Sequence, residues 1–134
     1  GGLMVANLLA HSDLFRAGIA RSGSYNKTNQ PFGFQSERRS LFKARDVYIQ
    51  VSPTFFADQV DEPVLIIHGN DDSNPGTLTF QSEVFYEAVR GSGGTARLVL
   101  LPYEDHGYRA KESIEHVLWE QLRWFDMYVK GNEN

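Results

Sequence analysis

Acidic residues and a histidine follow two apolar segments of this sequence, and side chains of these types can transfer protons. The run PVLIIH, residues 63–68, leads into GNDDSNPG, which places Asp71 and Asp72 just beyond it. The run ARLVLLP, residues 96–102, leads into YEDHGY, which places His106 just beyond that. An imidazole oriented by a carboxylate is an effective general base. Because Gly, Asn, Asp and Pro also dominate plain turns, a turn without chemistry is the alternative.

Three apolar segments, with helical patterns between them, must position these side chains. Residues 15–21, 63–68 and 96–101 are predicted strands, and residues 1–11, 78–91 and 110–130 are predicted helices. An irregular helical segment is expected within residues 36–50. Strands that are apolar throughout and alternate with helices indicate a parallel sheet covered on both faces. The predicted fold class is α/β, and no repeat or composition shift divides the chain into two domains.

The first and last helical patterns each place apolar residues on one side. In the last helix, apolar residues recur at the three- and four-residue spacing that is typical of a buried stripe. They are Ile114, Leu118, Leu122, Phe125 and Val129. In the first helix, Leu3, Met4, Leu8 and Leu9 fall on one side.

Asp72 and His106 are expected at the same edge of the predicted sheet. Reactive groups of open parallel sheets gather just past the carboxyl ends of the strands. The order acid then histidine is that of the last two members of an α/β-hydrolase triad, whose serine precedes both on a G-x-S-x-G turn. Gly1 and Gly2 match the end of such a turn, so the serine is expected two positions before Gly1, outside this chain.

Composition and charge argue against several other classes of protein. The chain has 13 Lys and Arg against 17 Asp and Glu, and no basic block, so nucleic acid is not an expected partner. It has no Cys, which excludes a thiolate nucleophile and a disulfide framework. The spacing of its four histidines fits no zinc site, so neither a metal nor another cofactor is expected. No apolar run approaches the roughly 20 residues that span a bilayer, so no membrane partner is expected. The sequence shows no targeting segment, and the compartment stays open.

Six segments resemble, in order and spacing, the carboxyl-terminal part of the catalytic domain of prolyl oligopeptidase family serine peptidases, nearest the glutamyl endopeptidase-like branch. They are GGLMVANLLAHSDLF, GIARSGSYN, PFGFQ, VSPTFFA, PVLIIHGNDDSNPGT and LPYEDHGY. The resemblance implies that residues 1–134 form the carboxyl-terminal half of an α/β-hydrolase fold, with three parallel strands, flanking helices and an incomplete sheet. It implies Asp72, and not Asp71, as the triad acid and His106 as the base. The nucleophile elbow, the upstream strands and the β-propeller have no counterpart here.

The same resemblance implies a function for the complete protein. That function is hydrolysis of peptide bonds by acyl transfer to a serine, with a peptide as substrate. An esterase of the same fold and a non-catalytic module derived from a hydrolase remain alternatives. Because the chain lacks the nucleophile, we expect it to be inactive alone. We also expect the open sheet edge to be covered by the remainder of the parent chain or by a second copy.

Further candidates lie in the loop SGSYNKTNQPFGFQ, residues 22–35. In the resembling family this segment lines the pocket for the residue before the cleaved bond, so Tyr25, Phe32 and Phe34 are candidates, and packing of these rings onto the core is the alternative. Specificity for glutamate would need a cation there, which Arg21, Lys27, Arg38 or Arg39 could supply. His68 is expected to be a structural hydrogen-bonding residue, and Ser92 in GSGG is expected in a turn.

Overall fold

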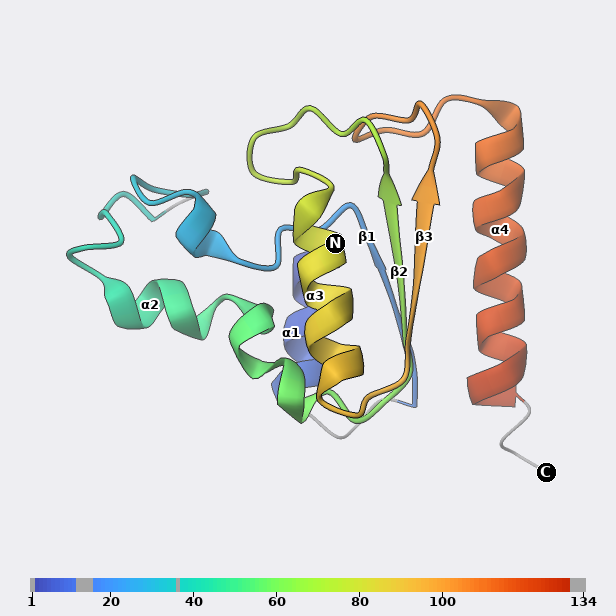
Figure 1. Cartoon of the computed structure of the whole chain (residues 1–134), viewed down its shortest axis with the longest axis horizontal. Coiled ribbons are helices and arrows are strands. Elements are labelled where there is room, and N and C mark those ends of the chain that lie inside the picture. Colours follow the sequence, from blue (N-terminus) through green and yellow to red (C-terminus); the bar gives the residue numbers. More distant parts are fainter. Residues whose placement is uncertain (1, 12–15, 36, 131–134) are drawn as a thin grey trace.

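The computed structural model describes residues 2–11, 16–35 and 37–130, and three parallel strands lie at its centre (Figure 1). The strands are β1 (Gly18–Arg21), β2 (Val64–Gly69) and β3 (Ala96–Leu101), in the order β1-β2-β3. Gly18 of β1 pairs with Val64 of β2, and Val64 pairs with Ala96 of β3. The predicted α/β class with three parallel strands is confirmed.

Helices cover both faces of this sheet. They are α1 (Gly2–His11), α2 (Arg45–Gln50), α3 (Phe80–Gly91) and α4 (Lys111–Phe125), and Asp126–Lys130 continue α4 as a π-helical turn. In Figure 1, α4 lies on one side of the sheet, and α1 and α3 lie on the other. The helices predicted at 1–11, 78–91 and 110–130 are confirmed within the described residues, and the irregular segment 36–50 contains α2. The first strand, predicted at 15–21, begins only at Gly18. Residues 1, 15 and 36 of these predictions lie outside the described residues.

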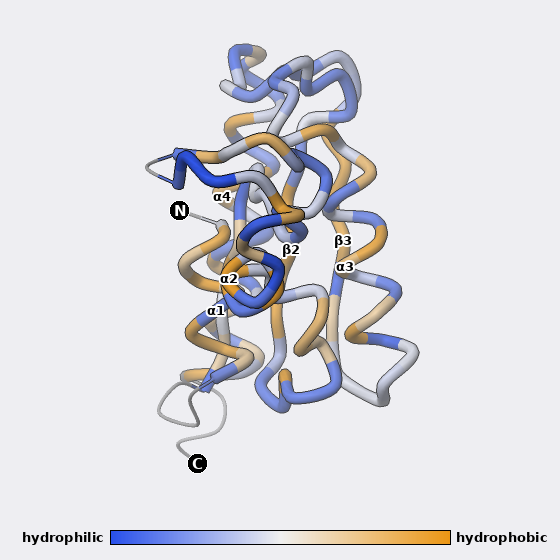
Figure 2. Tube along the Cα trace, turned by 90° about the vertical axis from the view of Figure 1, so that its left-hand side faces the viewer, coloured by the Kyte–Doolittle hydropathy of each residue, from blue (hydrophilic) through white to orange (hydrophobic). Residues whose placement is uncertain are grey.

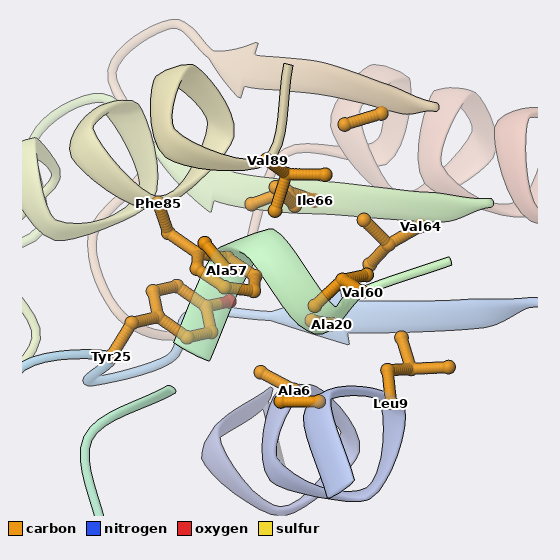
Figure 3. Close-up of a cluster of buried hydrophobic side chains, with 12 residues drawn as sticks. Ala6, Leu9, Ala20, Tyr25, Ala57, Val60, Val64, Ile66, Phe85 and Val89 are labelled. Carbon is orange, nitrogen blue, oxygen red and sulfur yellow. The ribbon is translucent and has the colours of Figure 1, made fainter. Parts of the chain in front are cut away.

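The central strand β2 is buried at every position because the sheet has two covered faces. Val64 and Ile66 pack with α1 and α3 around Phe85 (Figure 3). Leu65 and Ile67 pack on the opposite face with residues of β3 and α4. Burying each of these side chains contributes about 1.5–3 kcal/mol. The unbroken apolar run therefore reflects two separate cores, one for each face.

The edge strand β3 departs from the prediction of a strand that is apolar throughout, because Arg97 and Leu100 are exposed. Arg97 lies opposite Leu65 and reaches α4, where it donates hydrogen bonds of 2.7 and 2.9 Å to Glu120. The Glu120 side chain is buried, and its hydrogen bonds with Arg97 lower its pKa against the opposing effect of burial. This ion pair lets a carboxylate occupy the face of α4 that packs on the sheet.

The predicted buried stripe of α4 is wrong for this chain. Ile114, Leu118, Leu122 and Phe125 are between 46% and 58% exposed, and Val129 is half-buried. The residues that face the sheet are Val117, Glu120 and Trp124. Both sets have helical spacing, and the sheet of this chain covers only one of them. An apolar face of α4 is therefore left uncovered by the described residues.

Helix α1 begins in close contact with the end of β1. A Cβ at Gly2 would lie 2.8 Å from the carbonyl oxygen of Arg21 and 2.9 Å from the Cα of Gly23. Only glycine allows this approach, as expected for a helix that opens with small residues beside a strand. Figure 2 shows that α1 is largely hydrophobic. It buries Ala6, Leu9 and Ala10, whereas Met4 and Leu8, predicted on the same side as Leu9, are exposed.

None of the helices in the described part of the chain combines the length and apolar character needed to cross a bilayer.

Candidate active site

The carboxylate of Asp72 lies in the turn that follows β2. It is 6% exposed, and the turn returns it toward the strand end. Its Oδ1 accepts hydrogen bonds from the backbone N–H of Asn74 at 3.0 Å and from the hydroxyl of Thr77 at 3.3 Å. The first of these closes an Asx turn, a local structure that Asp favours. Residues of its own loop therefore hold Oδ1 of Asp72, independently of contacts with residues farther along the chain.

The other oxygen of Asp72 contacts two histidines. Oδ2 lies 3.1 Å from Nδ1 of His106 and 2.8 Å from Nε2 of His68. Thr77 also connects Asp72 with His106, because the hydroxyl that donates to Oδ1 of Asp72 lies 3.0 Å from Nδ1 of His106. The contacts of His68 and Thr77 with the carboxylate were not predicted. The i, i+4 spacing of His68 and Asp72 across a strand end is the sequence signal for the first of them.

His106 presents its second ring nitrogen away from the acid. With Nδ1 directed at a carboxylate, the ring donates a proton there and leaves Nε2 as an acceptor. Nε2 makes no hydrogen bond with the described residues, and the side chain is 48% exposed. This orientation suits an imidazole that takes a proton from a group outside the described residues.

Asp71 does not share this position. Its side chain is exposed, and its backbone N–H donates a hydrogen bond of 2.9 Å to the carbonyl of Glu104. The backbone N–H of Asn70 donates similarly to Leu101, at the end of β3. The two loops thus continue the pairing of their strands, and the adjacent aspartates point to different surroundings.

Gly69 brings the two loops close together. A Cβ at this position would overlap the carbonyl oxygens of Glu104 and Asp105. Because these are backbone atoms, a side-chain rotation could not relieve the overlap. The absence of a side chain at the end of β2 is what allows the loop after β3 to lie against it.

Asp105, in the loop after β3, holds this loop against the loop after β2 through hydrogen bonds. Its carboxylate accepts hydrogen bonds from the backbone N–H of Ser73 at 2.7 Å and from the Ser73 hydroxyl at 2.9 and 3.0 Å. It also accepts one from the backbone N–H of His106 at 2.8 Å. These bonds hold the pKa of Asp105 below its usual value. The residue preceding His106 therefore fixes the backbone from which the imidazole extends.

Glu104 fixes the far end of the same loop at the start of α4. Its carboxylate accepts hydrogen bonds of 3.0 and 3.1 Å from the backbone N–H groups of Arg109 and Ala110. Burial raises its pKa, but these bonds and one from the Ser113 hydroxyl outweigh that effect, so its pKa lies below the usual value. Ala110 offers no side-chain cap, and Glu104 instead holds the backbone at the two positions that precede α4.

The start of α1 and the loop of His106 both lie against the end of β1. Gly2 contacts Arg21 and Gly23, as described above. Ser22, between them, has its hydroxyl 2.7 Å from that of Tyr108 and 3.5 Å from the carbonyl of His106. Ser22 thus links the end of β1 to the loop that carries His106.

The loop after β1 places its aromatic rings differently from one another. Tyr25 is fully buried and stacks on Phe85 with ring centroids 4.6 Å apart, and burial raises its pKa (Figure 3). It therefore lies in the core instead of on an exposed pocket wall. Phe34 packs edge-on against Tyr48, whereas Phe32 is exposed.

The candidate cations for an acidic substrate also differ in their surroundings. Arg39 pairs with Glu37 at 2.8 Å, and Lys27 is buried, with its amine 5.3 Å from the ring of Phe34. Arg21 is exposed at the end of β1, with its guanidinium 5.0 Å from the ring of Tyr108. Burial lowers the pKa of Lys27. None of these positions identifies a cation for glutamate.

The remaining polar clusters offer no metal site, and the GSGG segment lies away from the acid and histidine. Within the residues that the structure describes, no three His, Cys, Asp or Glu side chains converge in a way that would hold a metal ion. Ser92 caps the end of α3 and precedes β3, so it lies at the amino edge of the sheet. The prediction of a turn at GSGG is confirmed.

Comparison with known proteins decides the family. The model of the prolyl oligopeptidase family matches residues 1–132, nearly the whole chain. The chain belongs to the prolyl oligopeptidase family. The predicted resemblance is thereby confirmed, and the three strands correspond to part of an α/β-hydrolase sheet.

Relatives within the family are much longer than this chain. It is 55% identical over 133 residues to "Probable glutamyl endopeptidase, chloroplastic" of Arabidopsis thaliana, an alignment that covers 98% of this chain and 14% of the relative. A Pyrococcus horikoshii acylaminoacyl peptidase structure superposes with a TM-score of 0.77 at 27% identity, covering 96% of this chain and 23% of that one. A puromycin hydrolase shares the fold with a TM-score of 0.84 at 24% identity, covering 95% and 20%.

Proposed function

We propose that this chain supplies the acid and the general base of a serine peptidase, with Asp72 as the acid and His106 as the base. The observation that carries the proposal is the 3.1 Å contact between Oδ2 of Asp72 and Nδ1 of His106 at the carboxyl edge of a parallel sheet. Membership of the prolyl oligopeptidase family supports it. The nucleophilic serine would come from residues that precede α1 in a complete protein of this family.

In the proposed reaction, Nε2 of His106 takes the proton of the serine hydroxyl while the serine oxygen bonds to the scissile carbonyl carbon. The imidazolium then gives this proton to the leaving amine as the C–N bond breaks, and the acyl-serine remains. A water molecule then gives a proton to Nε2 of His106 and bonds to the acyl carbon. The imidazolium returns this proton to the serine oxygen as the ester bond breaks, which releases the second peptide product. Asp72 holds the ring in the tautomer that leaves Nε2 unprotonated at the start, and it stabilises the imidazolium that follows.

The test is a pair of substitutions in the complete protein, Asp72→Asn and Asp71→Asn. Asn at position 72 presents an amide N–H where His106 needs an acceptor, so kcat should fall by about 10⁴-fold. Asp71→Asn is the matched control, because its side chain is exposed and only its backbone bonds to the histidine loop. Equal, mild effects at both positions would contradict the proposal.

Reaction with a fluorophosphonate probe separates the role of this chain from that of the complete protein. The complete protein should be labelled at one serine, and the 134-residue chain should not be labelled. Stoichiometric labelling of Ser22, Ser24 or Ser92 in the short chain would show that the nucleophile has been misplaced.

Two other functions use the same fold and lead to different results. An esterase would hydrolyse esters but not peptides, and a non-catalytic module would react with neither the probe nor a substrate. Peptides cleaved beside glutamate are the first substrates to test, since the plant relative is named a probable glutamyl endopeptidase.

A further inference from the structure

His68 contacts the same carboxylate oxygen as His106, but from the buried side. Its side chain is completely buried at the carboxyl end of β2. Nε2 of the ring lies 2.8 Å from Oδ2 of Asp72 and 2.6 Å from the carbonyl oxygen of Thr77. Both neighbours are acceptors, so Nε2 must carry a proton and donate it between them.

Helix α3 fixes the other side of the ring. Ser82, in its first turn and fully buried, places its hydroxyl 2.5 Å from Nδ1 of His68. A hydroxyl can donate where the ring nitrogen accepts, so the Ser82 contact matches a ring protonated at Nε2. The ring is thereby oriented by a helix and a strand, both of which belong to the core.

This arrangement bears on Asp72 because a carboxylate rotates easily about its last torsion. The Asx turn holds only Oδ1, whereas His68 holds Oδ2 from inside the protein. His68 also holds the carbonyl of Thr77, whose hydroxyl contacts both Asp72 and His106. One buried ring thus restrains the acid and the threonine beside it.

We propose that His68 is a positioning residue, which orients Asp72 so that Oδ2 faces Nδ1 of His106. The inference rests on the proposed function and extends it, since His68 would act only through the acid. Removing its donor should let the carboxylate turn and misalign His106. Because a displacement of about 1 Å at a reacting group can cost about 10²-fold in rate, the expected loss is in kcat and not in KM.

The test uses three substitutions at or beside His68 in the complete protein. His68→Phe keeps the ring volume and removes the donor, and kcat should fall by about 10²-fold with KM unchanged. His68→Gln keeps an N–H at the same reach and should recover part of the loss. Ser82→Ala removes the bond to Nδ1, together with the contact of the same hydroxyl with Tyr25, and should give a smaller loss than His68→Phe. If His68→Phe does not fold, the kcat of Ser82→Ala still tests whether the orientation of the His68 ring affects activity.

A double-substitution cycle separates positioning from a general loss of structure. In an Asp72→Asn background the His68→Phe change should cost nothing further, because the acid that it orients is already disabled. Tyr48→Phe is the matched control: Tyr48 is buried, and the change removes its part-buried hydrogen bond of 2.6 Å to the carbonyl of Arg39 on a different part of the chain. Its activity should match that of the wild type.

The outcomes distinguish the two proposals. If Asp72→Asn leaves activity intact, the proposed function fails. If Asp72→Asn abolishes activity but His68→Phe leaves kcat unchanged, or if the two losses multiply in the double variant, the role of His68 is overturned and the proposed function stands.

Discussion

Replacing Gly69 by alanine should separate the two loops that hold Asp72 and His106. The added Cβ would meet the carbonyl oxygens of Glu104 and Asp105, which are backbone atoms. Gly69 ends β2, and Asp105 directly precedes His106. The substitution therefore acts on the distance between the loops and removes no group that takes part in the proposed reaction.

The magnitude follows from how the overlap can be relieved. Overpacking a well-packed region costs about 1–3 kcal/mol, and a clash with backbone cannot be relieved by a new rotamer. The loop after β3 must then move away from β2 and carry His106 with it. A displacement of about 1 Å corresponds to a loss of about 10²-fold in kcat/KM.

The assay compares Gly69→Ala with Gly91→Ala in the complete protein. Gly91 ends α3, and a Cβ added there would have no atom of the described residues within 4 Å, so alanine at this position meets open space. Peptide hydrolysis measures kcat/KM, and urea unfolding measures the free energy of unfolding. If Gly69→Ala retains both the activity and the stability of Gly91→Ala, the argument that the close approach aligns the site is refuted.

Two further predictions concern acid stability and association. The pKa of Asp105 is lowered in the folded protein, so its ionised form contributes stability above its unfolded pKa of about 3.9 and loses it as the pH falls through the folded value. As the pH falls below about 4, the thermal midpoint of the wild type should therefore fall more steeply than that of Asp105→Asn, and parallel curves would contradict this. The isolated chain should self-associate at micromolar concentration, since the described residues leave one edge of β1 unpaired and an apolar face of α4 uncovered. A compact monomer in sedimentation with a cooperative melt would contradict this expectation.

The order of elements was predictable because β2 carries its signal locally. Its run of apolar residues is flanked by Pro63 and by the turn residues after Gly69, and the strand begins and ends within one residue of the prediction. The position of the candidate site at the carboxyl edge of the sheet could be predicted from the parallel strands alone, because the residues that follow β2 and β3 leave the sheet at the same edge. Local pattern thus located the loops of Asp72 and His106.

The face of α4 was not predictable from the same kind of pattern. Its apolar residues form one stripe, but the sheet packs on a second stripe that contains Glu120. A glutamate counts as polar until its partner is known, and Arg97 is 23 residues away in another element. Tyr25 poses the same difficulty, because its burial depends on stacking with Phe85, far along the sequence.

The hydrogen bonds around Asp72 were only partly predictable. The role of His68 as a structural hydrogen-bonding residue was expected, but its contact with the acid depends on how the turn folds back. The link between Ser73 and Asp105 joins two loops whose separation no sequence spacing specifies. Such contacts depend on the exact path of the backbone after each strand.

The hydrogen bonds and close contacts between the loops of Asp72 and His106 do not depend on the backbone that precedes α1. Every bond described above that aligns His106 with Asp72, from Gly69 to Asp105, joins residues of the same two loops or of the core beneath them. In the proposed reaction, a break in the backbone just ahead of α1 would therefore separate the nucleophile from His106 without disturbing the contact between His106 and Asp72. Two separately made polypeptides could then restore activity by association, in the manner of a split enzyme.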